Sequence, residues 1–454
     1  MRRHVIIGRM GPDDKLAIPV AGDETATYLQ LVASNTSFDH GIGHALDDLN
    51  TIGIFPSEVG LDLLVLAAHI HAADTRISRV TESQDTWTRE IRLVVPVSDL
   101  ARWTSVTQLL QRMLNFLTGD RWTVGFRARP KRFVSAVRKP LAKPKSLPYT
   151  ELSLFSGGLD SLIGAIDLLA QGRVPLLISH AGEGATSDAQ NALFDALKKQ
   201  YSSIPFERLR VWMSFPKGLV ADSAVEESTR SRSFLFLACG VFAGSGLSGG
   251  CTLRVPENGL IALNVPLDPL RLGSLSTRTT HPFYLSCWNK LVHLLGISAK
   301  AENPYHVKTK GEMVTECANP PVLAKLIPKS MSCSSPTKGR WQGHGIEHCG
   351  YCLPCLIRRA AIRHGLGKDP TTYTVANLAG HVLDTRQAEG QQARSFQVAI
   401  DRLSQRPGLA RLLIHKSGPL LDATAAEQTA LAEVYRRGLD EVAALLANVR
   451  TRPS

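Results

Sequence analysis

Long apolar runs are missing from this sequence: no stretch of about 18 or more apolar residues occurs, so no segment matches a membrane-crossing helix. The opening stretch, Met1 to Gly8, is too brief and soon too polar for a signal peptide. Internal repeats and long low-complexity segments are also absent. With 44% hydrophobic and 20% charged residues, the composition is that of an ordinary globular protein. We therefore expect a cytoplasmic protein without a membrane partner.

Acidic residues are missing from one stretch of the N-terminal third. Between Arg121 and Lys145 nine residues are Lys or Arg and none is acidic, in a chain whose net charge is +12. Such a segment could attract nucleic acid or an acidic protein. Aromatic side chains are sparse there, however, and prolines interrupt it, so a solvated basic linker explains it at least as well. We do not predict nucleic-acid binding.

The 454 residues exceed one ordinary core, which predicts two or three domains. Residues 1–148 carry no motif for chemistry, and we predict an α+β N-terminal domain there that could bind a partner. Its expected elements are strands at 4–7, 91–97 and 121–127 and helices at 61–76 and 103–117. A polar cluster within it is interpreted as a salt-bridge set, with an interface as the alternative: Asp74, Arg76, Arg79, Trp87 and Arg89.

From residue 149 to residue 375 strands and helices alternate, which is typical of a parallel sheet covered by helices. The expected strands are 152–155, 174–179, 209–212 and 259–264, and the expected helices are 189–200 and 233–243. Residues 376–454 are predicted to form a helical C-terminal extension, with helices at 396–403 and 429–446. Packing against the second domain is the plain interpretation of these helices, and a partner surface is the alternative.

A glycine-rich stretch follows the first strand of the alternating region. Gly157 and Gly158 permit backbone conformations that turn successive N–H groups toward an anion, and Ser156 and Ser161 add hydroxyl donors. The apolar pattern from Leu159 onward predicts a helix whose N-terminus faces a phosphate. The spacing is neither that of a Walker loop nor that of a dinucleotide fingerprint, so we interpret it as a pyrophosphate loop for ATP. A glycine turn that caps an ordinary helix is the alternative.

Two further polar groups flank apolar segments. Arg230 and Arg232 lead into the helix predicted at 233–243, where arginine can hold phosphate or carboxylate through paired donors. We favour a role in a site over surface solubility. Glu257 and Asn258 precede another apolar run and could read a polar heterocycle or only form a turn.

Four of the eight cysteines lie close together in the sequence: Cys333, Cys349, Cys352 and Cys355. Overlapping Cys-x-x-Cys units with a fourth cysteine nearby can supply tetrahedral thiolates for zinc. Four thiolates would close the coordination shell, so the metal is expected to stabilise the fold and not to activate water. The alternatives are an iron–sulfur cluster, a redox pair, or a zinc site in which His344 or His348 replaces one thiolate.

The loop and the cysteine cluster together resemble the QueC-like family of 7-cyano-7-deazaguanine synthases. The matching stretches are Ser156-Gly157-Gly158-Leu159-Asp160-Ser161, Arg230-Ser231-Arg232, Thr309-Lys310-Gly311-Glu312, and Cys349 to Cys355 followed by Arg358. The segment from Ser179 to Glu183 departs from the tyrosine-glycine-glutamine pattern usual in the family. The long N-terminal part is similar to that of QatC-type members, which belong to the Qat anti-phage defence system.

The resemblance implies a Rossmann-like domain of the adenine nucleotide alpha hydrolase type and an ATP-dependent carbon–nitrogen ligase. A 7-carboxy-7-deazaguanine-type carboxylate would be adenylated and transferred to an amine, in the defence relatives an amine of a partner protein from the same operon. Synthesis of the nitrile with ammonia and a catalytically silent nucleotide-binding scaffold are the alternatives. The implied cofactors are ATP, Mg²⁺ and Zn²⁺.

The resemblance also implies residue roles. The ATP-binding residues would be Phe155, Ser156, Gly157, Gly158, Leu159, Asp160, Ser161 and His180. The catalytic groups would be Asp160, Ser161, Arg232 and Lys310. Among these, Asp160 would help to place magnesium, while Arg232 and Lys310 would offset developing negative charge.

Overall fold

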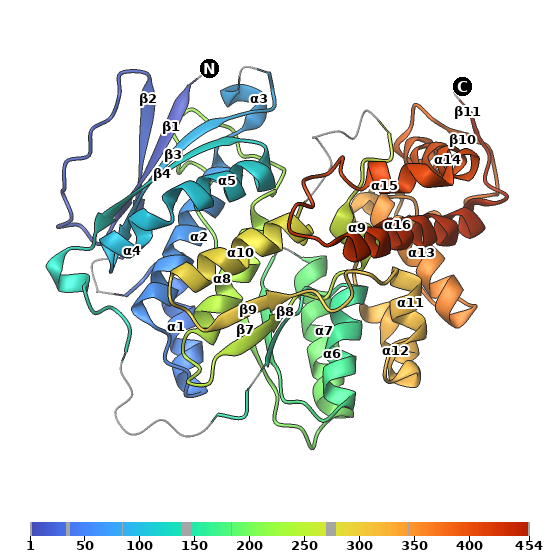
Figure 1. Ribbon diagram of the computed structural model, residues 1–454, viewed down its shortest axis with the longest axis horizontal. Coiled ribbons are helices and arrows are strands. Elements are labelled where there is room, and N and C mark those ends of the chain that lie inside the picture. The colour runs from blue at the N-terminus through green and yellow to red at the C-terminus, as the bar shows by residue number, and fades with distance from the viewer. Residues whose placement is uncertain are drawn as a thin grey trace.

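The structure is a computed structural model that describes residues 2–32, 37–83, 85–138, 147–149, 151–182, 184–268, 278–343 and 345–452. Figure 1 shows a parallel sheet near the N-terminus, a second sheet in the middle of the molecule, and the C-terminal helices at the opposite end. In these residues no helix combines the length and apolar character needed to cross a bilayer.

The first sheet has the strand order β2-β1-β3-β4, and all of its pairings are parallel. Its strands are β1 (Arg3–Arg9), β2 (Glu24–Gln30), β3 (Glu90–Val97) and β4 (Arg121–Ala128). The helices of this part are α1 (Ile42–Thr51), α2 (Glu58–Arg76), α3 (Arg79–Glu82), α4 (Leu100–Ser105) and α5 (Thr107–Thr118). The predicted α+β class is wrong for this part, because all strand pairings are parallel and helices carry the chain from β2 to β3 and from β3 to β4.

The elements expected in residues 1–148 are present, with two differences. The helix expected at 103–117 is divided at Val106 into α4 and α5. Strand β2 and the helices α1 and α3 were missed. Most side chains of β2 are only partly buried or exposed, so an apolar alternation that would identify this edge strand is nearly absent.

The second sheet has the order β7-β6-β5-β8-β9 and is also parallel throughout. Its strands are β5 (Glu151–Leu154), β6 (Leu176–His180), β7 (Glu207–Val211), β8 (Cys251–Arg254) and β9 (Ala299–Glu302). Its helices include α6 (Leu159–Ala170), α7 (Ala185–Gln200), α8 (Arg232–Gly244), α9 (Gly259–Leu263) and α10 (Pro282–Leu294). The chain leaves β5 toward β6 and β7 and then returns to β8 on the other side. The strand order therefore reverses at β5, where open parallel sheets bind ligands.

The strand predicted at 259–264 is wrong, because these residues form helix α9. The Asn258 side chain accepts the N–H of Ile261 at 3.1 Å and so caps the helix. A short apolar run does not by itself distinguish a strand from a buried helix. The strand of this region is β8, which precedes the run.

Successive side chains of β6 point to opposite faces of the second sheet, and both faces are covered. Leu176 and Ile178 face the apolar core shared with the first sheet, whereas Leu177 faces the core beneath α6 and α7. Helix α8 packs against β5, β6 and β8 and also against α2. One apolar core therefore runs from the first sheet through α2 and α8 to the second sheet. The division into domains at residues 148 and 375 stays a prediction.

The helices expected at 396–403 and 429–446 are confirmed within α14 and α16. The elements after the second sheet are α11 (Lys310–Thr315), α12 (Pro320–Leu326), α13 (Leu353–Leu366), β10 (Leu383–Asp384), α14 (Ala388–Gln405), α15 (Ala410–Leu413), α16 (Ala425–Leu446) and β11 (Thr451–Arg452). Short 3-10 turns lie at Lys131–Phe133, Ile327–Lys329, Lys338–Gln342 and Pro407–Leu409. Helix α16 shares an apolar core with α9, α13 and α14.

Candidate functional site

The glycine-rich loop joins the end of β5 to the start of α6, at the carboxyl edge of the second sheet. Gly157 has φ +83°, a left-handed conformation that favours glycine. A Cβ at Gly157 would also lie 3.2 Å from the backbone nitrogen of Gln190 and 3.3 Å from the carbonyl oxygen of Thr186. The loop therefore requires glycine at this position for conformation and for space.

The hydroxyl groups of the loop lie together at a cavity of about 400 Å³. Ser156 Oγ lies 3.2 Å from Ser161 Oγ, and Ser161 Oγ donates to the carbonyl oxygen of Gly158 at 3.0 Å. Both serines line the cavity, which opens at the N-terminus of α6. The predicted geometry of a helix N-terminus with flanking hydroxyls is thus present.

Buried Gln190 holds the loop from behind. Its amide nitrogen donates to the carbonyl oxygen of Ser156 at 3.3 Å and to that of His180 at 3.1 Å. Sequence reasoning missed Gln190, because nothing in the sequence of α7 distinguishes it from a surface glutamine.

The two predicted arginines have separate environments. The Arg230 guanidinium stacks on the Trp87 ring at 3.9 Å and donates to the carbonyl oxygen of Thr118 at 3.0 Å, so it belongs to the contact with the first sheet. The Arg232 guanidinium lies 5.3 Å from the Phe236 ring centre and lines the cavity. Burial lowers the pKa of Arg232, and no carboxylate of the described ranges forms a salt bridge with it. Arg232 is therefore a cation positioned for an anionic ligand.

A buried ionic cluster of the first sheet reaches the segment that carries Arg232. Asp74 accepts the backbone N–H of Ser231 at 2.7 Å and the Arg89 guanidinium at 2.8 Å. Arg89 also donates to Asp120 at 2.7 Å, as does Arg79 at 2.6 Å. The predicted salt-bridge set is confirmed for Asp74, Arg79 and Arg89, and it also forms a contact between the two sheets.

Asp160 lies at the centre of a second polar cluster. The Lys310 ammonium is 2.9 Å from one carboxylate oxygen, while the side-chain and backbone nitrogens of Asn258 lie 2.7 and 3.1 Å from the other. Burial raises the pKa of Asp160, but the Lys310 charge and the Asn258 hydrogen bonds outweigh it and hold this pKa below its ordinary value. Asp160 is therefore ionised and oriented.

Glu257 brings another carboxyl group to Asp160 and lines the cavity. Burial and then the Asp160 charge raise the pKa of Glu257 to about 8, against a smaller opposing effect of Lys310. At neutral pH the pair therefore holds one proton. The sequence pointed to Glu257 and Asn258 as polar residues near a strand end, but it did not pair them with Asp160.

His180 ends β6, and its ring lies near Arg232. The ring centres of His71 and Phe236 each lie 5.6 Å from that of His180. Burial, with smaller effects of His71 and Arg232, lowers the pKa of His180 to about 3, so its ring is neutral. The predicted contact of His180 with ATP stays a prediction.

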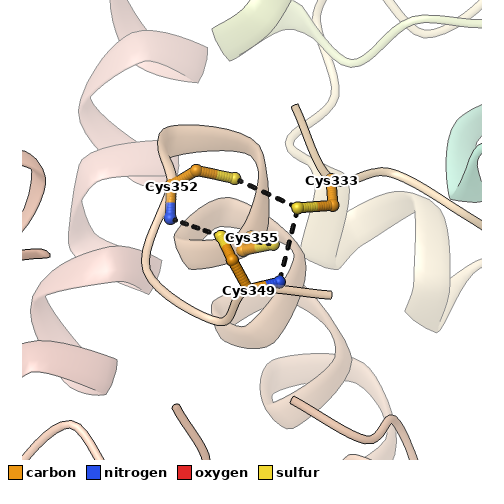
Figure 2. Close-up of side chains that lie close together, drawn as sticks. All are labelled: Cys333, Cys349, Cys352 and Cys355. Atoms are coloured by element: carbon orange, nitrogen blue, oxygen red, sulfur yellow. Dashed lines mark hydrogen bonds between the residues drawn. The ribbon is translucent and has the colours of Figure 1, made fainter. Parts of the chain in front are cut away.

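The four predicted cysteines converge, with all sulfur atoms within 4.8 Å of one another (Figure 2). The distances from Cys333 to Cys352 and from Cys349 to Cys355 are both 3.9 Å between sulfur atoms. Zinc–sulfur bonds of about 2.3 Å place the sulfurs of a tetrahedral site about 3.8 Å apart. The cluster can therefore hold a zinc ion.

Backbone N–H groups point at two of the four sulfur atoms and can donate hydrogen bonds to them, which stabilises thiolates. The amides of Cys349 and Ser335 lie 3.4 Å from Cys333 Sγ, and that of Cys352 lies 3.3 Å from Cys349 Sγ. His348 does not join the sulfur group, because its Nε2 accepts the N–H of Ser332 at 3.2 Å. The alternative ligand His344 lies outside the described residues.

The cysteine cluster and the glycine loop are directly connected. Met331 donates its N–H to the carbonyl oxygen of Gly157 at 2.8 Å, and Ser332 Oγ accepts the N–H of Leu159 at 3.2 Å. Cys333 follows immediately and lines the same cavity. Buried Arg358, predicted only through the family resemblance, donates to Ser332 Oγ at 3.3 Å. A metal ion held by the four cysteines would therefore stabilise one wall of the loop.

No protein-family model matches the chain, and a search of curated proteins finds no match. The functional interpretation consequently depends on the motifs and on the geometry of the cavity.

Proposed function

We propose that this chain is an ATP-dependent carbon–nitrogen ligase of the QueC-like type, with the second sheet as an adenine nucleotide alpha hydrolase-type domain. It adenylates a 7-carboxy-7-deazaguanine-type carboxylate and transfers the acyl group to an amine of a partner protein in anti-phage defence. One observation carries the proposal: the Ser156–Ser161 loop opens at the sheet's reversal point into a cavity that also contains Arg232.

In the first step a carboxylate oxygen of the acid attacks the α-phosphorus of ATP. The bond from this phosphorus to the bridging oxygen breaks, and pyrophosphate leaves with the electron pair. The N-terminus of α6 and the hydroxyls of Ser156 and Ser161 bind the departing phosphates. Arg232 offsets the charge that develops on them, since it lines the same cavity.

In the second step the amine nitrogen attacks the acyl carbon of the adenylate. A carbon–nitrogen bond forms, AMP leaves with the electron pair of the broken carbon–oxygen bond, and the nitrogen loses a proton. Threonine, phenylalanine and proline side chains line the cavity beyond the loop, where the acyl group would lie.

The cluster around Asp160 fits a magnesium ion. The carboxyl groups of Asp160 and Glu257 lie together with Lys310 as their close cation, so one positive charge is missing when both are ionised. Carboxylate oxygens are preferred ligands of Mg²⁺, which when bound neutralises phosphate oxygens. Asn258 orients Asp160 for this role, and Lys310 adds a positive charge beside the phosphates.

Release of pyrophosphate from magnesium ATP, with and without 7-carboxy-7-deazaguanine, tests the proposal. We expect release that depends on the acid, and Arg232→Gln should reduce its kcat by about 100-fold because a charge-stabilising group is lost. Arg436→Gln is the matched control, since Arg436 pairs with Glu433 and Asp440 on the surface of α16. Equal rates of Arg232→Gln and the wild type would contradict the assignment of the site.

The accepting amine is tested separately. Intact-mass analysis after co-expression with the operon neighbours should show a deazaguanine adduct on one of them. Turnover with ammonia and no adduct would instead support synthesis of the nitrile.

A nucleotide-binding scaffold is the second candidate. Asp160 is already engaged by Lys310 and Asn258, and the Leu159 N–H is already bonded to Ser332. ATP binding without any acid-dependent release of pyrophosphate would favour this scaffold over the ligase.

A further inference from the structure

Helix α16 of the C-terminal extension lies against both segments that converge on Asp160 (Figure 1). One of them is α9, whose capping residue Asn258 binds Asp160. Val434 is so close that a Cβ at Gly259 would lie 2.9 Å from its methyl groups, and a Cβ at Gly438 would lie 2.9 Å from Leu260. Contact this close fixes the start of α9 against α16.

The other segment is the turn that carries Lys310. The Glu441 carboxylate of α16 accepts the hydroxyl hydrogen of Thr309 through one oxygen and the N–H of Gly311 at 3.1 Å through the other. These two donors flank Lys310 in the sequence. A Cβ at Gly311 would overlap the Glu441 carboxylate, so glycine is required for this approach.

A second contact from α16, the ion pair of Arg437 with Glu312, holds the first turn of α11. Arg437 donates to the Glu312 carboxylate at 2.5 and 3.1 Å and to the carbonyl oxygen of Val307 at 3.0 Å. Glu312 is the capping-box residue of α11, which begins at Lys310. Helix α16 therefore determines both the start and the orientation of α11.

We propose that Glu441 is a positioning residue that fixes the turn Thr309–Gly311 so that Lys310 meets Asp160, next to Glu257, which lines the cavity. The inference rests on the proposed function, because it assigns Lys310 a role beside the phosphates. Simple packing would bury apolar side chains in this contact, whereas a buried carboxylate is unfavourable unless its oxygens are hydrogen-bonded. Both oxygens of Glu441 are bonded to the neighbours of the lysine, which makes the C-terminal extension a part of the site.

A double-mutant cycle tests this role through the kcat of pyrophosphate release. Glu441→Gln leaves the volume unchanged but loses an acceptor, so we expect kcat to fall about tenfold and KM for ATP to change little. Lys310→Met should lower kcat by roughly 100-fold. In the variant with both changes kcat should equal that of Lys310→Met, because a lysine that is absent cannot be misplaced.

Asp440→Asn on the same helix is the control, because the Asp440 side chain is 62% exposed and pairs only with surface Arg436 among the described residues. Its kcat should match that of the wild type. If Glu441→Gln does not fold, Thr309→Val takes its place in the cycle, because it removes one of the two contacts together with the Thr309 cap of α11. If the fold-changes in kcat of the two single variants multiply in the double variant, the inference is overturned. Glu441 would then affect catalysis whether or not Lys310 is present, as a purely structural residue would.

Failure of the proposed function gives a different result. If the wild type releases no pyrophosphate, the four proteins of the cycle are compared by calorimetric titration with magnesium pyrophosphate. These are the wild type, Glu441→Gln, Lys310→Met and the variant with both changes. Non-additive losses of affinity would then support the positioning role without the ligase reaction. A wild-type protein that neither releases nor binds pyrophosphate would overturn both proposals.

Discussion

The two larger sheets share a parallel topology but differ at their carboxyl edges. In the first sheet Arg127 is paired with Asp14, and Arg129 is paired with Asp62 and, at 2.6 Å, with Glu58. In the second sheet the cation at the same edge, Arg232, lines a cavity and has no carboxylate partner in the described ranges. Parallel strands alone therefore do not make a binding site. The edge of the second sheet is a candidate site because Arg232, which lines its cavity, has no carboxylate partner among the described residues.

The largest expected difference concerns the buried ion cluster of the first sheet. Arg89→Met leaves Asp74 and Asp120 buried with less positive charge, so the free energy of unfolding should fall by about 3–5 kcal/mol. Arg121→Met should change it by no more than about 0.5 kcal/mol, because the Arg121 side chain is 76% exposed in its ion pair with Glu90. Urea denaturation measures both values. Equal losses would mean that burial of the charges is unimportant here.

The loops after β1 and β5 allow a matched glycine comparison. Gly11 and Gly157 have φ +96° and +83°, so alanine should strain either backbone by about 1–2 kcal/mol. At Gly157 the added Cβ also meets the backbone of α7, whereas at Gly11 it lies 3.6 Å from the Phe133 ring. We expect Gly157→Ala to abolish the release of pyrophosphate and Gly11→Ala to leave the kcat of release unchanged. An active Gly157→Ala enzyme would contradict the assignment of the loop.

Metal removal tests the connection between the cysteine cluster and the loop. Chelation should release Met331 and Ser332 from the loop and so weaken the binding of magnesium ATP by at least about tenfold, since ordering even one residue again costs about 1–2 kcal/mol. Affinity should return when zinc is added back. Ser332→Ala, which removes one hydrogen bond to the loop, should produce a smaller loss without releasing metal. Unchanged affinity for magnesium ATP after complete metal loss would show that the cysteine cluster does not support the glycine-rich loop.

The smallest expected effect concerns pH and the contact between the sheets. Burial lowers the pKa of His180 to about 3, so the unfolded chain binds a proton below pH about 6.5 that the folded chain does not. The contribution of His180 to the free energy of unfolding is thus fully present above pH 6.5, where the ring is neutral in both states. It is lost as the pH falls toward 3. His180→Phe should therefore gain about 1.3 kcal/mol relative to the wild type between pH 7 and pH 5.5. Parallel pH profiles would show that folding does not lower the pKa of His180.

Local patterns were sufficient for some parts of the fold and of the candidate site. The glycine loop, the helix after it and the cysteine cluster were predictable, because their residues lie within a few turns of chain and their chemistry requires particular spacings. The class of the N-terminal sheet and the helix at Gly259–Leu263 were predicted wrongly. In both cases short apolar runs were assigned without knowledge of their partners.

The sequence by itself determined the geometry of the glycine-rich loop at Gly157, the set of four thiols and the alternation of strands and helices around them. Only the tertiary structure decided which residues complete the cluster, since Asn258 lies 98 positions from Asp160, Glu441 lies 132 from Thr309, and Asp74 lies 157 from Ser231. These contacts are hydrogen bonds between segments that lie far apart in the sequence. They leave no periodicity in the sequence, because hydrophobic burial elsewhere brings the segments together.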